Sequence, residues 1–199
     1  MQDTTNSVSI AGRLSSLELS HRIYGEAFYT FFLECERLSD KADVLPVTIS
    51  ERLLAKHALG GGEMVLVKGQ LRSYNKLVDG RVRLYLTVFA REIAESGTYV
   101  NDIELKGFVC KPPVFRVTPF GREITDMLVA VNRAYNKSDY VPCIVWGRNA
   151  RFASAFEVGD KVALHGRVQS RQYEKALETG EKTTRIAYEV SISRLQKEW

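Results

Sequence analysis

Hydrophobic and polar positions alternate along most of the chain, in short runs separated by glycine, proline and polar stretches. In the second half, such runs occupy residues 102–109, 123–132, 140–146, 161–173 and 185–195. A two-residue period predicts half-buried β-strands. The segment 149–156 differs, because its apolar residues have helical spacing and Gly159 ends it. The pattern therefore predicts three strands, one helix and two more strands.

The first half has the same order. Its predicted strands cover residues 7–14, 28–36, 44–50, 64–74 and 81–93, with a helix at 52–59 and a join at 94–100. Five strands with a helix between the third and the fourth is the arrangement of the OB-fold, a small barrel that binds oligonucleotides or oligosaccharides. The expected fold class is all-β, with one short helix per domain and two tandem five-stranded OB-fold barrels. The expected domains cover residues 1–95 and 100–199.

The two halves repeat each other position by position. Segment 6–12 returns as 101–107, and the spacing between matched residues grows along the chain: Gly12 and Gly107 lie 95 positions apart, Pro46 and Pro142 lie 96 apart, Gly69 and Gly166 lie 97 apart, and Arg83 and Arg185 lie 102 apart. Because the spacing between matched residues only increases along the chain, the matched elements are separated by loop insertions. A period of about one hundred residues is far longer than that of solenoid repeats. The chain therefore contains two copies of a whole domain.

The composition is that of a globular protein, with 45% hydrophobic and 26% charged residues among 199. The sequence contains no run of about eighteen apolar residues, and it begins with the polar stretch Met1-Gln-Asp-Thr-Thr-Asn. We therefore expect neither a membrane span nor a secretion signal, and a cytoplasmic location.

Cysteine and histidine residues give no sign of metal or catalytic chemistry. Cys35, Cys110 and Cys143 lie far apart in apolar runs, which is typical of core thiols in a reducing compartment. The three histidines have no second His or Cys at ligand spacing. No nucleophile motif such as Gly-x-Ser-x-Gly is present. We expect no cofactor, no metal ion and no enzymatic activity.

The net charge of +4 lies entirely in the second half. Residues 1–97 hold 12 Lys plus Arg and 12 Asp plus Glu, whereas residues 98–199 hold 16 and 12. Aromatic residues accompany this excess at Tyr135, Tyr140, Trp146 and Tyr173. The basic residues among them are Arg133, Lys137, Arg148, Arg151, Arg167, Arg171 and Lys175. Unpaired bases stack on aromatic rings for about 1–3 kcal/mol each while Lys and Arg contact phosphates, so the pattern predicts a surface for single-stranded nucleic acid.

Five stretches of the second half point to a known family: Asn101-Asp-Ile-Glu-Leu-Lys-Gly107, Arg116-Val-Thr-Pro-Phe-Gly121, Leu128-Val-Ala-Val-Asn-Arg133, Tyr140-Val-Pro-Cys-Ile-Val-Trp-Gly-Arg148 and 162–173. Together they resemble the bacterial single-stranded DNA-binding protein from residue 101 to about 195. In that family bases stack on four aromatic positions, and the resemblance places these at Tyr135, Tyr140, Trp146 and Tyr173. It implies binding of single-stranded DNA with little sequence preference, in replication, recombination or repair.

The matched positions of the first half hold Ser39, Val44, Ser50 and Lys76, none of which is aromatic. We therefore expect the second domain to be the main DNA-binding domain and the first to be degenerate for stacking. Some residues of the first domain remain able to contact a passing backbone, namely Arg72, Tyr74, Lys76, Arg81 and Arg83.

Two departures from the family shape the remaining expectations. The usual member has one barrel per chain, forms a tetramer and ends in a disordered tail with an acidic, apolar tip. Two barrels per chain imply a homodimer with four OB-folds. This chain ends Arg194-Leu-Gln-Lys-Glu-Trp199, without such a tip, so an accessory or specialised role is expected, with single-stranded DNA and replication or recombination proteins as partners in the nucleoid.

Two other hypotheses compete with this one. In the first, the chain is a primosome-type or recombination-type accessory protein whose OB-folds mainly dock partner proteins. In the second, the chain binds RNA, because stacking alone does not distinguish ribose from deoxyribose.

Overall fold

The structure is a computed structural model, and it describes residues 5–37, 39, 41–57, 62–78, 80–176, 180 and 182–198. The first half contains β1 (Asn6–Leu14), β2 (Glu18–Ile23), β3 (Glu26–Glu36), β4 (Ala42–Ser50), α1 (Glu51–Leu54), β5 (Met64–Val78) and β6 (Arg81–Glu95). The second half contains β7 (Val100–Val109), β8 (Val114–Val117), β9 (Glu123–Arg133), β10 (Lys137–Trp146), α2 (Arg148–Ala153), β11 (Lys161–Ala176) and β12 (Lys182–Glu198). The all-β fold class with one short helix in each half is therefore confirmed.

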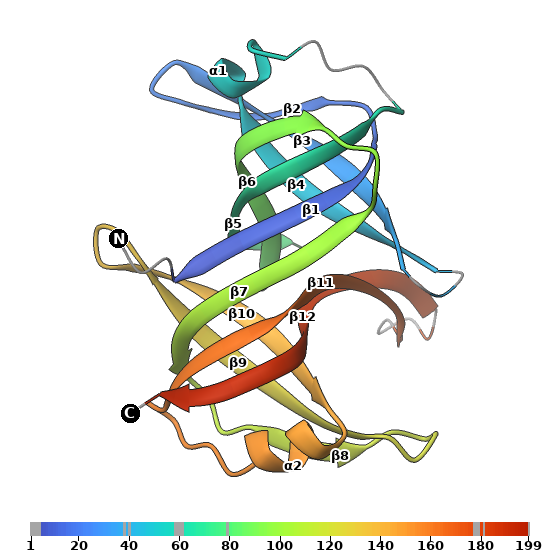
Figure 1. Cartoon of the computed structure of the whole chain (residues 1–199), viewed down its shortest axis with the longest axis vertical. Helices are drawn as coiled ribbons and strands as arrows, with labels where there is room; N and C mark the ends of the chain where they lie inside the picture. Colours follow the sequence, from blue (N-terminus) through green and yellow to red (C-terminus); the bar gives the residue numbers. More distant parts are fainter. Residues whose placement is uncertain are drawn as a thin grey trace.

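Five strands of each half close into a barrel. In the first half they follow the order β3-β4-β6-β5-β1, and β1 closes the ring by pairing with β3. In the second half they follow the order β9-β10-β12-β11-β7, and β7 closes the ring by pairing with β9. The strand before the helix pairs in parallel with the last strand of its half, as β4 does with β6 and β10 with β12. The result is two tandem five-stranded OB-fold barrels, which lie one above the other in Figure 1.

The sequence pattern missed β2 and β8 and extended both helices too far. Every residue of β2 and β8 is exposed, so these end strands of the sheet lack the alternation that marks the others. Helix α1 ends at Leu54, whereas the predicted helix ended at residue 59. Residues 58 and 59 lie outside the described part of the chain. Helix α2 ends at Ala153 instead of 156. Phe156 is buried just beyond it, edge-on to Phe152 at 5.0 Å.

The matched glycines of the repeat stand where two strands approach too closely for a side chain. A Cβ atom on Gly12 would lie 2.4 Å from the carbonyl oxygen of Glu34, and one on Gly107 would lie 2.4 Å from that of Ala130. These contacts adjoin the residues at which β1 and β7 close their barrels. The repeated glycines therefore reflect barrel closure in both halves.

The two barrels share one continuous sheet. Strands β1 and β7 pair antiparallel over six residues, from Asn6 opposite Leu105 to Ala11 opposite Val100. They run side by side across the middle of the molecule in Figure 1. The described strands thus form a single twelve-stranded sheet, in which β2 and β8 are the two end strands.

A buried carboxylate of the second barrel holds the first barrel in place. Asp139 is 1% exposed, and its Oδ1 accepts a 2.8 Å hydrogen bond from the backbone N–H of Ser73 on β5. Arg72 of the same strand donates to Asp139 at 3.0 Å, and Arg133 donates at 3.4 Å. A charge-assisted contact of this kind fixes orientation more firmly than a neutral hydrogen bond.

The reciprocal contact is made by a buried carboxylate of the first barrel. Asp43 is fully buried, and it accepts a 2.8 Å hydrogen bond from the backbone N–H of Ser170 on β11. Arg37 and Arg167 donate to the same carboxylate at 2.8 Å and 3.4 Å. Each barrel thus inserts one Asp against a strand of the other, so the two barrels form one interlocked body.

Candidate nucleic-acid interface

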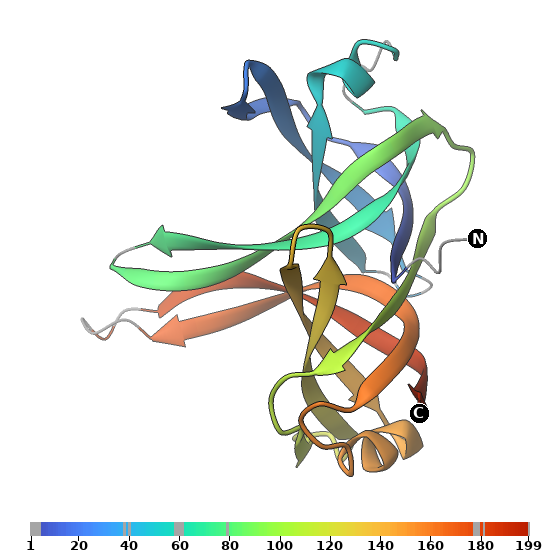
Figure 2. The ribbon, with the colours of Figure 1, turned by 90° about the vertical axis from the view of Figure 1, so that its left-hand side faces the viewer.

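Two long hairpins project from the barrels on the same side of the molecule. They are formed by β5 with β6 and by β11 with β12, and they lie one above the other in Figure 2. The second hairpin pairs as far as Ala176 opposite Lys182. The surfaces around these hairpins carry four of the residues that the sequence singled out, namely Trp146, Arg167, Arg171 and Tyr173.

Trp146 ends β10 at the wall of a groove of about 770 Å³. Its ring is half-buried, and its Nε1 donates a 3.1 Å hydrogen bond to the Oγ atom of Ser191. The basic residues that line this groove are Arg122, Arg167 and Arg171 from the second barrel and Arg37 and Lys41 from the first. The groove therefore combines an aromatic ring with positive charge supplied by both barrels.

Two arginines of this groove are held in place by neighbouring side chains. Arg167 shares the Asp43 carboxylate with Arg37, and burial together with the nearby Arg37 charge lowers the pKa of Arg167. Arg171 lies 3.5 Å from Glu189 and over the ring of Tyr173, at 5.7 Å from the ring centroid. A cation placed over a tyrosine ring leaves its remaining N–H groups available for phosphate oxygens.

Tyr173 lines a second cleft, of about 540 Å³, between the two hairpins. Arg171 and Ile186 line both this cleft and the groove at Trp146, so the two are contiguous. The structure thus brings Trp146, Arg167, Arg171 and Tyr173 together along one connected depression. We call its first part the Trp146 groove and its continuation the inter-hairpin cleft.

Tyr135 and Tyr140 lie elsewhere, beside the first barrel. Tyr135 occupies the turn between β9 and β10 with φ 62°, and its side chain is 93% exposed. The backbone N–H of Tyr140 donates a 2.7 Å hydrogen bond to Ser73 Oγ of β5. Six residues of extended strand, or about 20 Å, separate Tyr140 from Trp146. The four aromatic positions are therefore divided between two regions.

The remaining predicted cations divide in the same way. Arg133 pairs with Asp139 near Tyr140, and Lys137 is exposed at the start of β10. Arg148 is exposed on α2, while Arg151 pairs with Glu123 and lines a cavity of about 540 Å³ with Trp146. The side chain of Lys175 lies outside the described part of the structure.

The matched positions of the first barrel have other structural roles. Val44 is 40% exposed and donates its N–H to Ser170 Oγ at 3.2 Å, in the way that Tyr140 donates to Ser73. Ser50 Oγ accepts the N–H of Leu53 at 3.3 Å and so caps α1. Lys76 is exposed on β5.

The sequence indicated Arg83 of the first barrel, which lines the inter-hairpin cleft, but not the other residues that this barrel contributes. Arg37 and Lys41 reach the Trp146 groove, and Tyr85 reaches the inter-hairpin cleft. Arg122 of the second barrel was also missed, although it directly precedes a predicted strand. Because the sequence does not indicate how the two barrels face each other, it did not place Arg37 and Lys41 in the Trp146 groove.

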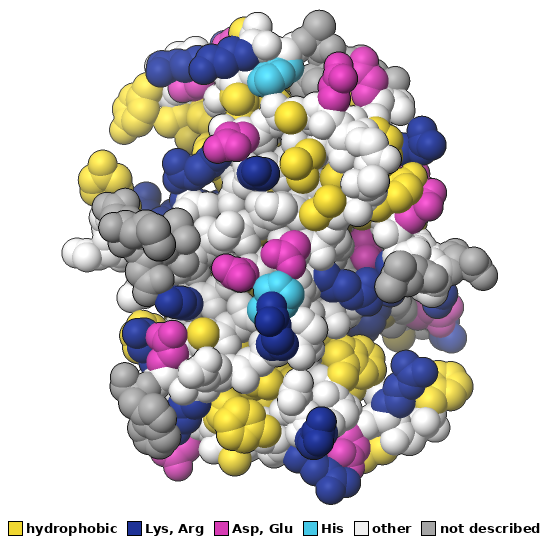
Figure 3. Space-filling model, viewed as in Figure 1, with side chains coloured by type: hydrophobic (Ala, Val, Ile, Leu, Met, Phe, Trp, Pro, Cys, Tyr) yellow, Lys and Arg dark blue, Asp and Glu magenta, His cyan; other side chains and the backbone are white. Residues whose placement is uncertain are grey.

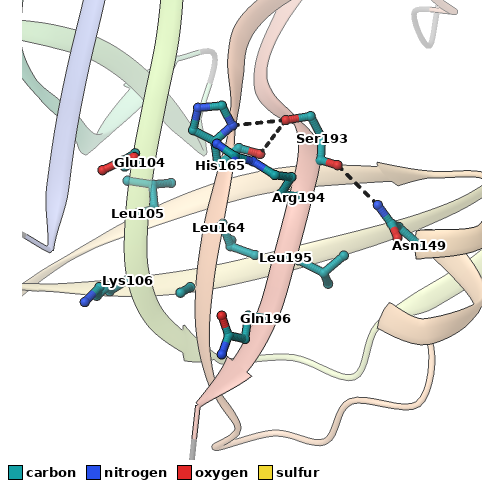
Figure 4. A pocket seen from close by; sticks show the side chains of 11 residues that line it. Glu104, Leu105, Lys106, Asn149, Leu164, His165, Ser193, Arg194, Leu195 and Gln196 are labelled. Carbon is teal, nitrogen blue, oxygen red and sulfur yellow. Dashed lines mark hydrogen bonds between the residues drawn. The ribbon is translucent and has the colours of Figure 1, made fainter.

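The outer face of the sheet over β7, β11 and β12 carries a different group of side chains. His165 Nε2 lies 2.7 Å from Asp102 Oδ1, and its Nδ1 lies 3.2 Å from Ser193 Oγ. Figure 4 shows that Ser193 also contacts the His165 carbonyl and Asn149. Acidic, basic and histidine side chains lie side by side over this face in Figure 3. Unlike the Trp146 groove, this face has mixed charge.

The described residues offer neither a metal site nor a membrane-spanning helix. Within the described ranges, no three His, Cys, Asp or Glu side chains form a group able to hold a metal ion. No helix in that part of the chain is long and apolar enough to cross a membrane.

The fold and the groove together define a class: tandem OB-fold proteins with an aromatic, basic groove. The model of the Single-strand binding protein family matches residues 100–197. The similarity to this family therefore covers the second half of the chain.

Named relatives agree with this assignment. The "Single-stranded DNA-binding protein 2" of Listeria innocua and the "Single-stranded DNA-binding protein" of Clostridium tetani are each 33% identical over 82 residues. The match covers 38% of this chain and 52% and 57% of the two relatives. The chain therefore spans about half the length of the curated relatives it matches.

Solved structures resemble the whole chain. The wild-type single-stranded DNA binding protein from Thermus aquaticus superposes with a TM-score of 0.79 at 21% identity, covering 98% of this chain and 93% of that one. A deletion mutant of the same protein gives a TM-score of 0.80, also at 21% identity, with 98% and 94% coverage. This similarity shows that the fold is shared across both barrels.

Proposed function

We propose that this chain binds single-stranded DNA with little sequence preference and thereby protects or organises it in replication, recombination or repair. The observation that carries the proposal is the Trp146 groove, in which an aromatic ring lies among Arg122, Arg167 and Arg171. Stacking on the ring recognises any base, and the arginines contact phosphates. The names of the curated relatives support the same activity.

In this proposal the second barrel is the main binding domain. Bases stack on Trp146 and Tyr173 in the groove and on Tyr135 and Tyr140 beside the first barrel. The basic residues proposed to contact phosphates are Arg133, Lys137, Arg148, Arg151, Arg167, Arg171 and Lys175. The first barrel contributes fixed geometry through the Asp43 and Asp139 contacts, and it adds positive charge from Arg37 and Lys41.

We further propose a non-enzymatic protein that acts as a homodimer with four OB-folds in the cytoplasm, at the nucleoid. The row of Asp102, His165 and Ser193 lies on an open sheet face, and the Ser193 hydroxyl donates to the carbonyl of His165 itself, so we assign it no catalytic role. Sedimentation at micromolar concentration tests the dimer, since a monomer mass would contradict it.

The binding proposal is tested by fluorescence anisotropy of end-labelled deoxythymidine oligomers, with unlabelled competitors. We expect single-stranded DNA to compete well and duplex DNA of equal length to compete poorly. Affinity should fall as salt rises, because phosphate contacts release counterions. RNA of equal length competing better than DNA would instead favour an RNA-binding protein. The absence of any binding at low salt would contradict the proposal.

A further inference from the structure

Tyr85 of the first barrel lines the inter-hairpin cleft and stacks on Tyr74, which lies next to it. Tyr74 and Tyr85 face each other across β5 and β6, with ring centroids 5.6 Å apart and planes inclined by 17°. The Tyr74 side chain is 49% exposed, and Tyr85 lines the cleft. A parallel ring pair that is still half-exposed presents a surface on which a further aromatic ring can stack.

The second barrel adds rings from the opposite side. Tyr188 of β12 lines the same cleft, and burial together with the neighbouring Tyr74 raises the pKa of Tyr188. Tyr173 of β11 also lines it, with Arg171 over its ring. Tyrosine rings from both barrels therefore gather in one cleft.

The charges along the cleft suit a polyanion. Arg83 of the first barrel and Arg171 and Arg185 of the second line it. The acidic side chain in the lining is Glu189, which is 7% exposed and accepts a 2.7 Å hydrogen bond from Gln169. Arg171 lies 3.5 Å from the same carboxylate. The Glu189 carboxylate is thus buried and hydrogen-bonded, whereas the three arginines that line the cleft are only partly buried or exposed.

The position of the cleft links the two separated groups of predicted aromatic residues. On one side it continues into the Trp146 groove through Arg171 and Ile186. On the other side it reaches Pro142, which lies two residues from Tyr140 on the same face of β10. A single strand of nucleic acid that extends from Tyr140 to Trp146 would therefore pass along this cleft.

We propose that the inter-hairpin cleft is a binding subsite for single-stranded nucleic acid, in which a base stacks on the Tyr74–Tyr85 pair while arginines of both hairpins contact the flanking phosphates. The inference rests on the proposed function and extends it, since it makes the first barrel a direct participant in stacking. The chain then has a base-stacking surface that its sequence repeat does not indicate.

The test uses a double variant, Tyr74→Leu with Tyr85→Leu, which keeps apolar bulk and removes both rings. The matched control is Tyr24→Leu, because Tyr24 is a fully exposed tyrosine at the distant β2–β3 turn of the same barrel. Both variants and the parent chain are titrated with deoxythymidine oligomers of about 5 and about 30 nucleotides, lengths that bracket the usual site sizes. Circular dichroism establishes that each variant is folded.

We expect the double variant to lose about fivefold or more in affinity for the long oligomer, since one lost base stack has at least that effect. Its affinity for the short oligomer, which Trp146 alone accommodates, should stay within about twofold of the parent value. Tyr24→Leu should leave both affinities unchanged. In the parent chain, photo-cross-linking with iodouracil-substituted DNA should label the peptides that carry Tyr74 or Tyr85.

Several results would overturn the proposal. Unchanged affinity of the double variant, with cross-links confined to the second barrel, would show that the ring pair only stabilises its hairpin. A change in sedimentation with no change in affinity would show that the cleft is a contact between two copies of the chain. If the parent chain binds neither oligomer, the proposed function itself fails, and that outcome is distinct from the other two.

Discussion

Replacing Trp146 by alanine is expected to weaken binding of single-stranded DNA by about 5-fold to 150-fold. The ring lines the groove beside Arg122 and Arg171, and stacking of one base on such a ring contributes about 1–3 kcal/mol, which corresponds to that range of affinity. The substitution also removes the hydrogen bond from Nε1 to Ser191, so the variant should be less stable as well as weaker in binding.

Trp146→Phe separates these two effects. Phenylalanine keeps an aromatic face for the base, although a smaller one, and lacks the Nε1 donor. We expect its affinity to stay within about threefold of the parent value, while its free energy of unfolding falls by about 1 kcal/mol. Urea denaturation measures the second quantity independently of DNA.

Ser50→Ala is the matched control in the first barrel. Ser50 occupies the position equivalent to Trp146, but it caps α1 by accepting the N–H of Leu53. Its loss should lower stability by about 1 kcal/mol and leave the affinity for DNA unchanged. The pair of variants thus reports whether the two barrels differ in stacking at this position.

The assay is anisotropy of a labelled deoxythymidine oligomer at four or more salt concentrations. Trp146→Ala should shift the affinity at every salt concentration by the same factor, because it removes no charge. The reasoning is refuted if Trp146→Ala and Ser50→Ala change affinity equally, or if Trp146→Ala changes the slope of affinity against salt.

Three further predictions concern charge, the barrel contacts and the repeat. Arg171→Gln should reduce the slope of log affinity against log salt by about 0.7, measured by the same anisotropy assay, and an unchanged slope would remove Arg171 from the phosphate contacts. Asp139→Asn should lower the free energy of unfolding by about 3 kcal/mol because two arginines lose their buried partner, whereas Asp126→Asn on the surface should cost less than about 1 kcal/mol. Gly107→Ala should lower the free energy of unfolding by about 2 kcal/mol, since its Cβ would lie 2.4 Å from a β9 carbonyl oxygen. Gly97→Ala, whose Cβ would have nothing within 4 Å, should leave the free energy of unfolding nearly unchanged. Urea denaturation measures both.

The internal repeat made it possible to predict the fold from the sequence. Gly12 and Gly107 recur because both barrels close with the same close approach of strands, and alternation located the strands that have one buried face. Strands β2 and β8 were not predicted, because all their residues are exposed and show no alternation of buried and exposed positions. The helix predicted to 156 was too long because Phe156 packs on Phe152 after the helix has ended.

The contacts between the two barrels could not be predicted from the sequence. Nothing local to Asp139 indicates that it binds the N–H of Ser73 in the other half of the chain. Similarly, the approach of Arg37 to the Trp146 groove depends on long-range packing. One local signal did exist: Tyr74 and Tyr85 flank the turn at Gly80 at positions that pair across a hairpin, and this spacing predicts a same-face ring pair.

The most direct test of the central claim is the fluorescence of Trp146 during titration with single-stranded DNA. The chain has two tryptophans, so a Trp199→Phe variant isolates the signal of Trp146. Titration with deoxythymidine oligomers of increasing length at two salt concentrations should quench this fluorescence, with weaker binding at the higher salt. Binding of DNA without any quenching of Trp146 would contradict the claim that bases stack in the Trp146 groove.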